Sequence, residues 1–158
     1  MRRVIVASLV AVALAGCSAG FWDLDPEVRI ELAPPVASAA RIEAVEVRSS
    51  VYNPPDAFSE AFIPAFRSQT DACARGQTVL RAVVFIHALD RGGTLLDEDG
   101  RGRLSGSVDL MDPRGRVVGR YPLSVTLPDS GGDLTERRVK LADALGAELC
   151  REAFAQGA

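Results

Sequence analysis

The chain has 158 residues, of which 47% are hydrophobic and 25% are charged. These values are ordinary for one globular domain, and they exclude a disordered, collagen-like or polytopic membrane chain. The 18 basic and 21 acidic side chains give a net charge of −3. The sequence therefore lacks the basic excess that is typical of nucleic-acid-binding proteins, and no nucleic-acid partner is expected.

The first seventeen residues are organised like an export signal. Arg2 and Arg3 precede an uncharged run of twelve residues, 4–15. This run is about half as long as a membrane-spanning helix, so it predicts a signal peptide over residues 1–16. It leads into Leu14-Ala15-Gly16-Cys17, in which small residues directly precede a cysteine.

This segment resembles the lipobox of bacterial lipoproteins. The resemblance implies that Cys17 carries fatty acyl chains such as palmitate on its sulfur, that cleavage occurs just before it, and that the new amino terminus is acylated too. Each buried methylene contributes about 0.8 kcal/mol, so such an anchor would hold the domain at a bilayer. By the sorting habit of enterobacterial lipoproteins, in which an aspartate at this position favours the inner membrane, the resemblance also implies that Ser18 favours the outer membrane and a domain facing the periplasm. An ordinary secretory peptide is the alternative, and it also places the domain outside the cytoplasm.

Cys73 and Cys150 form an even pair once Cys17 is used for lipid. In an oxidising compartment this favours a disulfide that contributes about 4 kcal/mol at most, and two buried free thiols are the alternative. His87 is the only histidine, and no second cysteine lies near either member of the pair. We therefore expect no structural metal and no other cofactor.

The mature chain divides into a tether and one domain. Residues 17–40 contain Pro26, Pro34 and Pro35 and are predicted to tether the lipid to a single domain over 41–156. Residues 41–51 are rich in valine with partial alternation, which predicts a half-exposed strand.

A helix with an aromatic stripe is predicted next, from the cap candidate Asp56 to a stop at Gly76. Pro64 lies inside this pattern, and the helix is expected to break near Ile63. The stripe is interpreted as core rather than as a binding site, and consists of Phe58, Phe62, Phe66 and Cys73.

Residues 78–89 carry the strongest strand pattern, with one wholly apolar face and one mixed face. Residues 91–103 are glycine-rich and acidic and are predicted to form a long loop. Two alternating strands follow, joined by a turn whose second residue is Pro113 and whose fourth is Gly115, which indicates a hairpin. Asp133 and Glu136 match a capping-box start for a final helix that ends near Phe154.

The predicted order is strand-helix-strand-strand-strand-helix. The simplest packing is an α+β fold in which two helices cover one face of a four-stranded, mainly antiparallel sheet. It brings the helices that carry Cys73 and Cys150 together. Such a body resembles several families of small envelope lipoproteins, of transport-auxiliary or assembly type, many of unknown function.

Catalysis is not expected, and no catalytic residue is assigned. A hydrolase would need His87 as its base, but no nucleophile elbow accompanies it. The sheet face without helices is the predicted contact surface for another envelope protein, with a merely solvated face as the alternative. A carrier or sensor of an apolar ligand or lipid, held near the phenylalanines, is the second hypothesis. The predicted contact residues are Arg81, Val83, Phe85 and His87.

Overall fold

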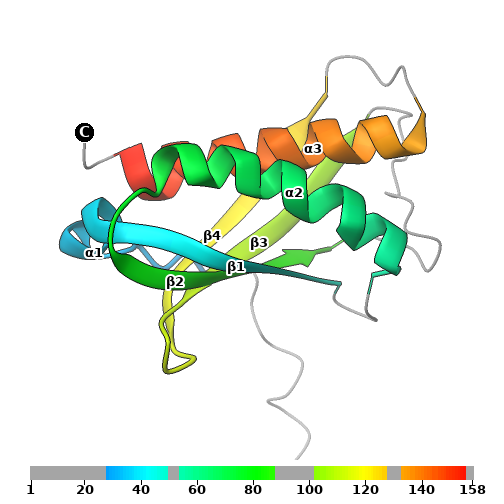
Figure 1. The fold of residues 1–158 in the computed structure, drawn as a ribbon. Helices are drawn as coiled ribbons and strands as arrows, with labels where there is room; N and C mark the ends of the chain where they lie inside the picture. Colours follow the sequence, from blue (N-terminus) through cyan, green and yellow to red (C-terminus); the bar gives the residue numbers. More distant parts are fainter. Residues whose placement is uncertain (1–27, 50–53, 88–101, 128–132, 156–158) are drawn as a thin grey trace, which may run out of the picture.

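The computed structural model describes residues 28–49, 54–87, 102–127 and 133–155. The four strands form one sheet in the order β1-β2-β3-β4, and the helices α2 and α3 lie side by side over one of its faces (Figure 1). The predicted α+β class is therefore confirmed. The elements in chain order are α1 (Pro34–Ala39), β1 (Ala40–Ser49), α2 (Asp56–Cys73), β2 (Thr78–Ile86), β3 (Arg103–Met111), β4 (Val117–Thr126), α3 (Leu134–Leu149) and the π-helix η1 (Cys150–Phe154).

The sheet is mixed, so the prediction of a mainly antiparallel sheet is wrong. β1 and β2 run parallel, whereas β2 with β3 and β3 with β4 run antiparallel. The helix α2 connects β1 to β2, and a helical crossover of this length is what allows two neighbouring strands to point the same way. The predicted element order also lacks the short helix α1, in which two prolines occupy the first turn.

The core lies between the sheet and the two long helices. The predicted apolar face of β2 is confirmed, because Leu80, Ala82, Val84 and Ile86 are all at most 1% exposed. The predicted aromatic stripe of α2 is also core. Its rings stack along the helix, with centroid separations of 5.5 Å between Phe58 and Phe62 and 5.9 Å between Phe62 and Phe66.

Close approach of α2 and α3 depends on Gly146. A Cβ atom at this position would lie 2.8 Å from Cβ of Gln69 and 2.9 Å from the carbonyl oxygen of Phe66. Backbone oxygens cannot swing aside as side chains do, so a larger residue would push the helices apart. A glycine that is unfavourable for an isolated helix is therefore what lets these two helices touch.

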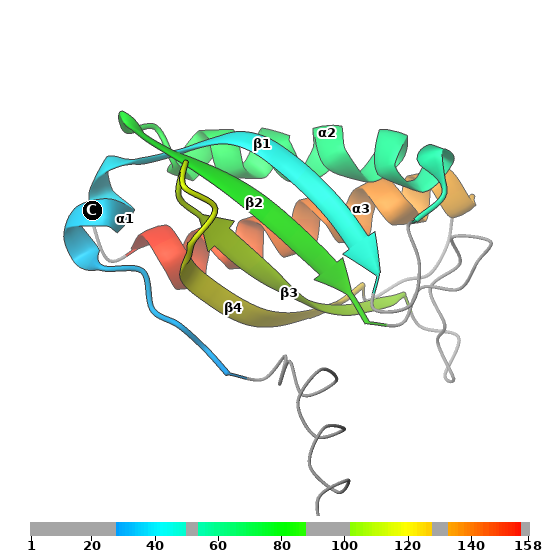
Figure 2. The same ribbon diagram turned by 90° about the horizontal axis from the view of Figure 1, so that it is seen from below.

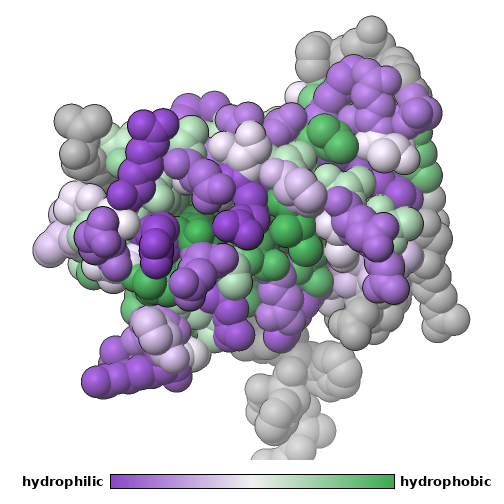
Figure 3. Space-filling view, viewed as in Figure 1, coloured by the Kyte–Doolittle hydropathy of each residue, from purple (hydrophilic) through white to green (hydrophobic). Residues whose placement is uncertain are grey.

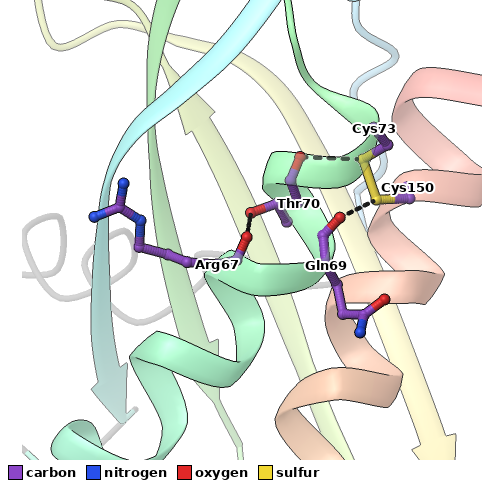
Figure 4. The surroundings of a disulfide bond; sticks show 5 residues. All are labelled: Arg67, Gln69, Thr70, Cys73 and Cys150. Atoms are coloured by element: carbon purple, nitrogen blue, oxygen red, sulfur yellow. Dashed lines mark hydrogen bonds between the residues drawn. A yellow bond between two sulfur atoms is a disulfide. The ribbon is translucent and has the colours of Figure 1, made fainter.

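The disulfide between Cys73 and Cys150 is present, with a Cα–Cα distance of 5.8 Å (Figure 4). It joins the last residue of α2 to the first residue of η1. The sulfur of Cys73 lies 3.4 Å from the carbonyl oxygen of Thr70, and that of Cys150 lies 3.3 Å from the carbonyl oxygen of Gln69. Disulfide sulfurs carry no hydrogen, so both are packing contacts against the α2 backbone.

α2 is continuous through Pro64, and the break expected near Ile63 does not occur. Proline lacks the N–H that would bond the carbonyl of Glu60, but both residues are exposed, so water can satisfy that carbonyl. The helix cap is also displaced, because Pro55 occupies it and Asp56 lies in the first turn. At α3 the predicted cap is confirmed, since Oδ1 of Asp133 accepts a hydrogen bond of 2.8 Å from the backbone N–H of Glu136.

Residues 28–33, here called the N-terminal strap, lie against the outer edge of β4 rather than leading freely away. Ile30 exchanges two backbone hydrogen bonds with Arg120, at 2.9 and 2.8 Å. The backbone N–H of Leu32, a buried residue, donates to the hydroxyl oxygen of Tyr121 at 2.8 Å. The tether predicted over 17–40 therefore meets the domain at Arg29, eleven residues before its predicted end.

Arg29 fixes the strap from outside. Its guanidinium pairs with Glu31 and, at 2.6 Å, with Glu152 of η1, and it lies 5.1 Å from the centre of the Tyr121 ring. The strap thus bridges β4 and the end of the last helix. No helix within the described ranges has the length and apolar content that crossing a bilayer requires.

Tyr121 should make the stability of the folded protein sensitive to alkaline pH. Burial raises the pKa of the Tyr121 phenol, whose ordinary value is about 10. The folded protein thus favours the neutral phenol, and this stabilisation is complete below pH about 10 and is lost as the pH rises through the raised pKa. We expect Tyr121→Phe to remove this loss from a denaturation series at increasing pH.

The same substitution leaves the buried N–H of Leu32 without its acceptor. At neutral pH it should therefore cost about 1–3 kcal/mol of unfolding free energy. An unchanged neutral-pH stability would show that the hydroxyl does not hold the strap, and an alkaline loss that persists in Tyr121→Phe would show that the loss does not come from the Tyr121 phenol.

Candidate interaction surface

The four strands leave one face without a helix in the described part of the chain. In Figure 2 the strands lie in front of both long helices, so this face is toward the viewer. We call it the open face and define it by the strand residues that alternate with the core-facing ones. Its members include Ala44, Glu46, Arg48, Arg81, Val83, Phe85, Arg103, Ser105, Ser107, Asp109, Met111, Arg120, Pro122 and Ser124.

The predicted contact residues lie in sequence along β2 and just beyond it. Arg81 is exposed and Phe85 is half-buried on the open face, whereas Val83 is only 2% exposed. Val83 lies between Glu46 of β1 and Asp109 of β3, so it supports its neighbours and offers almost no surface itself.

His87 follows β2 in a turn and is exposed. Its backbone N–H donates to the carbonyl oxygen of Ser105 at 3.1 Å. Partial desolvation lowers the pKa of the imidazole from its ordinary value near 6.5, so the side chain is neutral at neutral pH. Among the described residues, its imidazole has no hydrogen bond to a serine, threonine or cysteine side chain, and no cluster of metal-ligating side chains occurs.

A buried ion pair on the β3–β4 side of the open face was not predicted. Asp109 of β3 lies opposite Arg120 of β4, and two hydrogen bonds of 2.6 Å join the guanidinium to the carboxylate. The carboxylate side chain is 6% exposed and the guanidinium side chain 20% exposed. The hydrogen bond to Asp109 raises the pKa of Arg120, and this charge is therefore already neutralised within the chain.

The register of β3 with β4 explains why this pair cannot be predicted from the sequence. The turn closes with a 2.9 Å hydrogen bond from Gly115 N–H to the Asp112 carbonyl, and Gly115 has a φ of 78° as the predicted turn requires. A regular ladder from this turn would place Asp109 opposite Gly119. A bulge between Leu110 and Met111, which pair with Gly119 and Val117, shifts the pairing by one residue and brings Arg120 there instead.

A cleft of about 550 Å³ opens at the end of the open face where β2 begins. Its walls are the bulged part of β1, the start of β2 and the β3–β4 turn, which reaches across the start of β2 in Figure 2. Viewed from the side of α2 and β1, this turn projects from the body as a hydrophilic protrusion (Figure 3). The cleft is lined by Glu43, Ala44, Val79, Leu80, Arg81, Met111, Asp112, Pro113, Arg114 and Gly115.

Neither a protein-family model nor a curated protein sequence matches the chain. A substituted PelC dodecamer from Paraburkholderia phytofirmans has a similar structure, with a TM-score of 0.50 and 15% identity, covering 80% of this chain and 95% of that chain. Another crystal form of the PelC dodecamer from the same organism gives a TM-score of 0.42 and 14% identity, covering 81% and 96%. At this identity, the first match shows similarity of fold alone.

Proposed function

We propose that the protein is a non-enzymatic lipoprotein of the cell envelope. In this proposal, lipid on Cys17 anchors it to the outer membrane, and the domain binds another envelope protein as an assembly or transport accessory. The anchor is supported by the lipobox-like residues 14–17. The binding role is supported by the open face, which combines aromatic, aliphatic and arginine side chains as protein interfaces do.

The face is a better contact surface than either edge of the sheet. The outer edge of β4 is occupied at Arg120 by the N-terminal strap. The other edge strand, β1, has a bulge between Ile42 and Ala44 and carries the charged residues Arg41 and Glu43 beside it. Bulges and charges are the features by which natural sheets resist pairing with another strand.

The fold neighbour is described as a dodecamer, which makes a second copy of this chain an alternative partner. Carriage of an apolar ligand between helices and sheet is less well supported. There the stacked rings of Phe58, Phe62 and Phe66 are at most 1% exposed. The cleft described above and a second one of about 440 Å³ on the outer side of α2 lie elsewhere.

The anchor is tested by Cys17→Ala. The variant should leave the membrane fraction and should no longer incorporate labelled palmitate, because the thiol is the acceptor of the lipid. Ser18→Asp is the matched control, which should keep the label and alter only the membrane in which the protein is found. Membrane-bound, labelled protein in Cys17→Ala would contradict the anchor.

The contact surface is tested by Phe85→Glu in the full-length, lipidated protein. We expect loss of a stoichiometric partner from detergent-solubilised membranes while the circular dichroism spectrum stays native, since a charge on the open face opposes docking. Leu134→Glu is the control, because Leu134 is an exposed apolar residue of the helical layer. Two differently tagged copies in one cell distinguish self-association from a foreign partner. Equal recovery with both variants would refute the open face as the contact surface.

A further inference from the structure

The charged side chains that line the cleft at the end of the open face differ in whether they have a partner of opposite charge. Both carboxylates of the cleft are compensated within the chain. Oδ1 of Asp112 accepts hydrogen bonds from the backbone N–H groups of Arg114 and Arg116, at 2.9 and 3.0 Å, and Oδ2 accepts from the Arg116 side chain at 2.8 Å. Glu43 pairs with Arg41 at 3.7 Å.

The two guanidinium groups that line the cleft have no such compensation. Within the described ranges, the guanidinium of Arg81 has one hydrogen-bond partner, the sulfur of Met111 at 3.5 Å from Nη2, and a thioether is a weak acceptor. The side chain of Arg114 forms no ion pair with any described carboxylate, although its backbone N–H is bonded. Nearby arginines do have carboxylate partners, namely Glu46 for Arg48, Asp112 for Arg116 and Asp109 for Arg120.

The cleft therefore presents two uncompensated positive charges beside apolar surface. Ala44, Val79 and Met111 supply the apolar part, and Pro113 adds a rigid wall at the turn. Guanidinium groups are suited to planar carboxylates, which they bind through two parallel hydrogen bonds. A volume of about 550 Å³ accommodates several side chains of an extended segment.

We propose that this cleft binds an acidic segment of a protein partner, with carboxylates on Arg81 and Arg114 and an intervening aliphatic side chain against Val79 and Met111. The inference rests on the proposed function and specifies the chemistry by which the partner is recognised. Asp109 and Arg120 neutralise each other on the β3–β4 side of the face, so Arg81 and Arg114 of the cleft supply the charge selectivity.

The test uses the full-length, lipidated protein in an uncharged detergent and a short rhodamine-labelled peptide in which glutamate and valine alternate at every second position with serine between them, so that both share one face of the extended chain. Fluorescence anisotropy should show saturable binding that weakens as salt rises, because salt screens exposed charges. The corresponding peptide of glutamine and valine should not bind. Arg81→Gln and Arg114→Gln should each weaken binding about tenfold through loss of a charged hydrogen-bonding partner.

Arg103→Gln is the matched control, because Arg103 also lies on the open face but outside the cleft and bonds Ser124. It should bind the acidic peptide like the unmodified protein. Equal binding by all three variants would overturn the proposal. So would displacement of the peptide by micelles containing phosphatidylglycerol or by inorganic phosphate at comparable concentration, which would identify a headgroup or a phosphate ion as the ligand.

Partner recovery separates this inference from the function on which it rests. If Phe85→Glu abolishes recovery of the partner and Arg81→Gln with Arg114→Gln does not, the open face binds the partner but the acidic-segment inference is wrong. If neither Phe85→Glu nor the double arginine variant alters recovery of the partner, the proposed contact surface itself is wrong.

Discussion

Phe62→Ala should lower the free energy of unfolding by about 3–5 kcal/mol, the range for truncating a fully buried phenylalanine. Phe62 is 0% exposed and stacks on Phe58 and Phe66 in the middle of α2. Its removal costs both the transfer of the ring from water and the contacts of its two neighbours. Because domains of this size are stable by about 5–15 kcal/mol, the loss is a large fraction of the total. Urea denaturation followed by circular dichroism measures it.

Phe85→Ala makes the same chemical change on the open face, where the ring is only half-buried. It should cost clearly less than Phe62→Ala, and Phe62→Leu should fall between them because leucine fills more of the space than alanine. This milder variant also provides a measurement if Phe62→Ala does not fold. A larger loss in Phe85→Ala than in Phe62→Ala would mean that the helical face of the sheet is not the main core.

Replacing both Cys73 and Cys150 with alanine should cost up to about 4 kcal/mol, the second large effect. The bond closes a loop with a sequence separation of 77 residues, so it removes many conformations from the unfolded chain. It also holds the end of α2 against the start of η1, where close packing at Gly146 depends on the two helices staying in register. Urea denaturation of the variant and of the unmodified protein, with and without dithiothreitol, measures the difference.

Dithiothreitol should lower the stability of the unmodified protein to that of the double variant and should leave the double variant unchanged. Without reductant, an alkylating reagent should modify neither Cys73 nor Cys150 in the unfolded protein. Alkylation of both residues under that condition would indicate two free thiols, the alternative that the sequence leaves open.

Local chemistry was sufficient to predict several elements. Proline and glycine at the second and fourth positions defined the β3–β4 turn, and Gly115 adopts the positive φ that the turn requires. One wholly apolar face opposite a mixed face defined β2, and the polar cap Asp133 defined the start of α3. Each of these signals lies within a few residues of the feature that it predicts, so no knowledge of the tertiary structure was needed.

Features set by distant contacts were not predicted. Parallel pairing of β1 with β2 depends on where α2 returns the chain, and the helix tolerates Pro64 because that side meets water. Leu32 is buried against a β4 edge nearly ninety positions away, where its N–H meets Tyr121. The cleft, likewise, exists only because the turn at Pro113 lies beside the bulge of β1. Alternation assigned Arg81 and Phe85 to the candidate surface but gave no sign that Val83 is covered by its neighbours.

In the proposed anchoring, the N-terminal strap limits the length of chain that can separate the lipid on Cys17 from the domain. Eleven residues lead from Cys17 to Val28, and at about 3.3–3.6 Å for each extended residue they reach roughly 40 Å at most. Because the strap is hydrogen-bonded to β4, residues 28–33 cannot lengthen this connection without breaking the hydrogen bonds to Arg120 and Tyr121. With lipid on Cys17, the sheet would stay within a shallow layer above the bilayer. A protein that binds the cleft through an acidic segment would have to extend that segment into this layer.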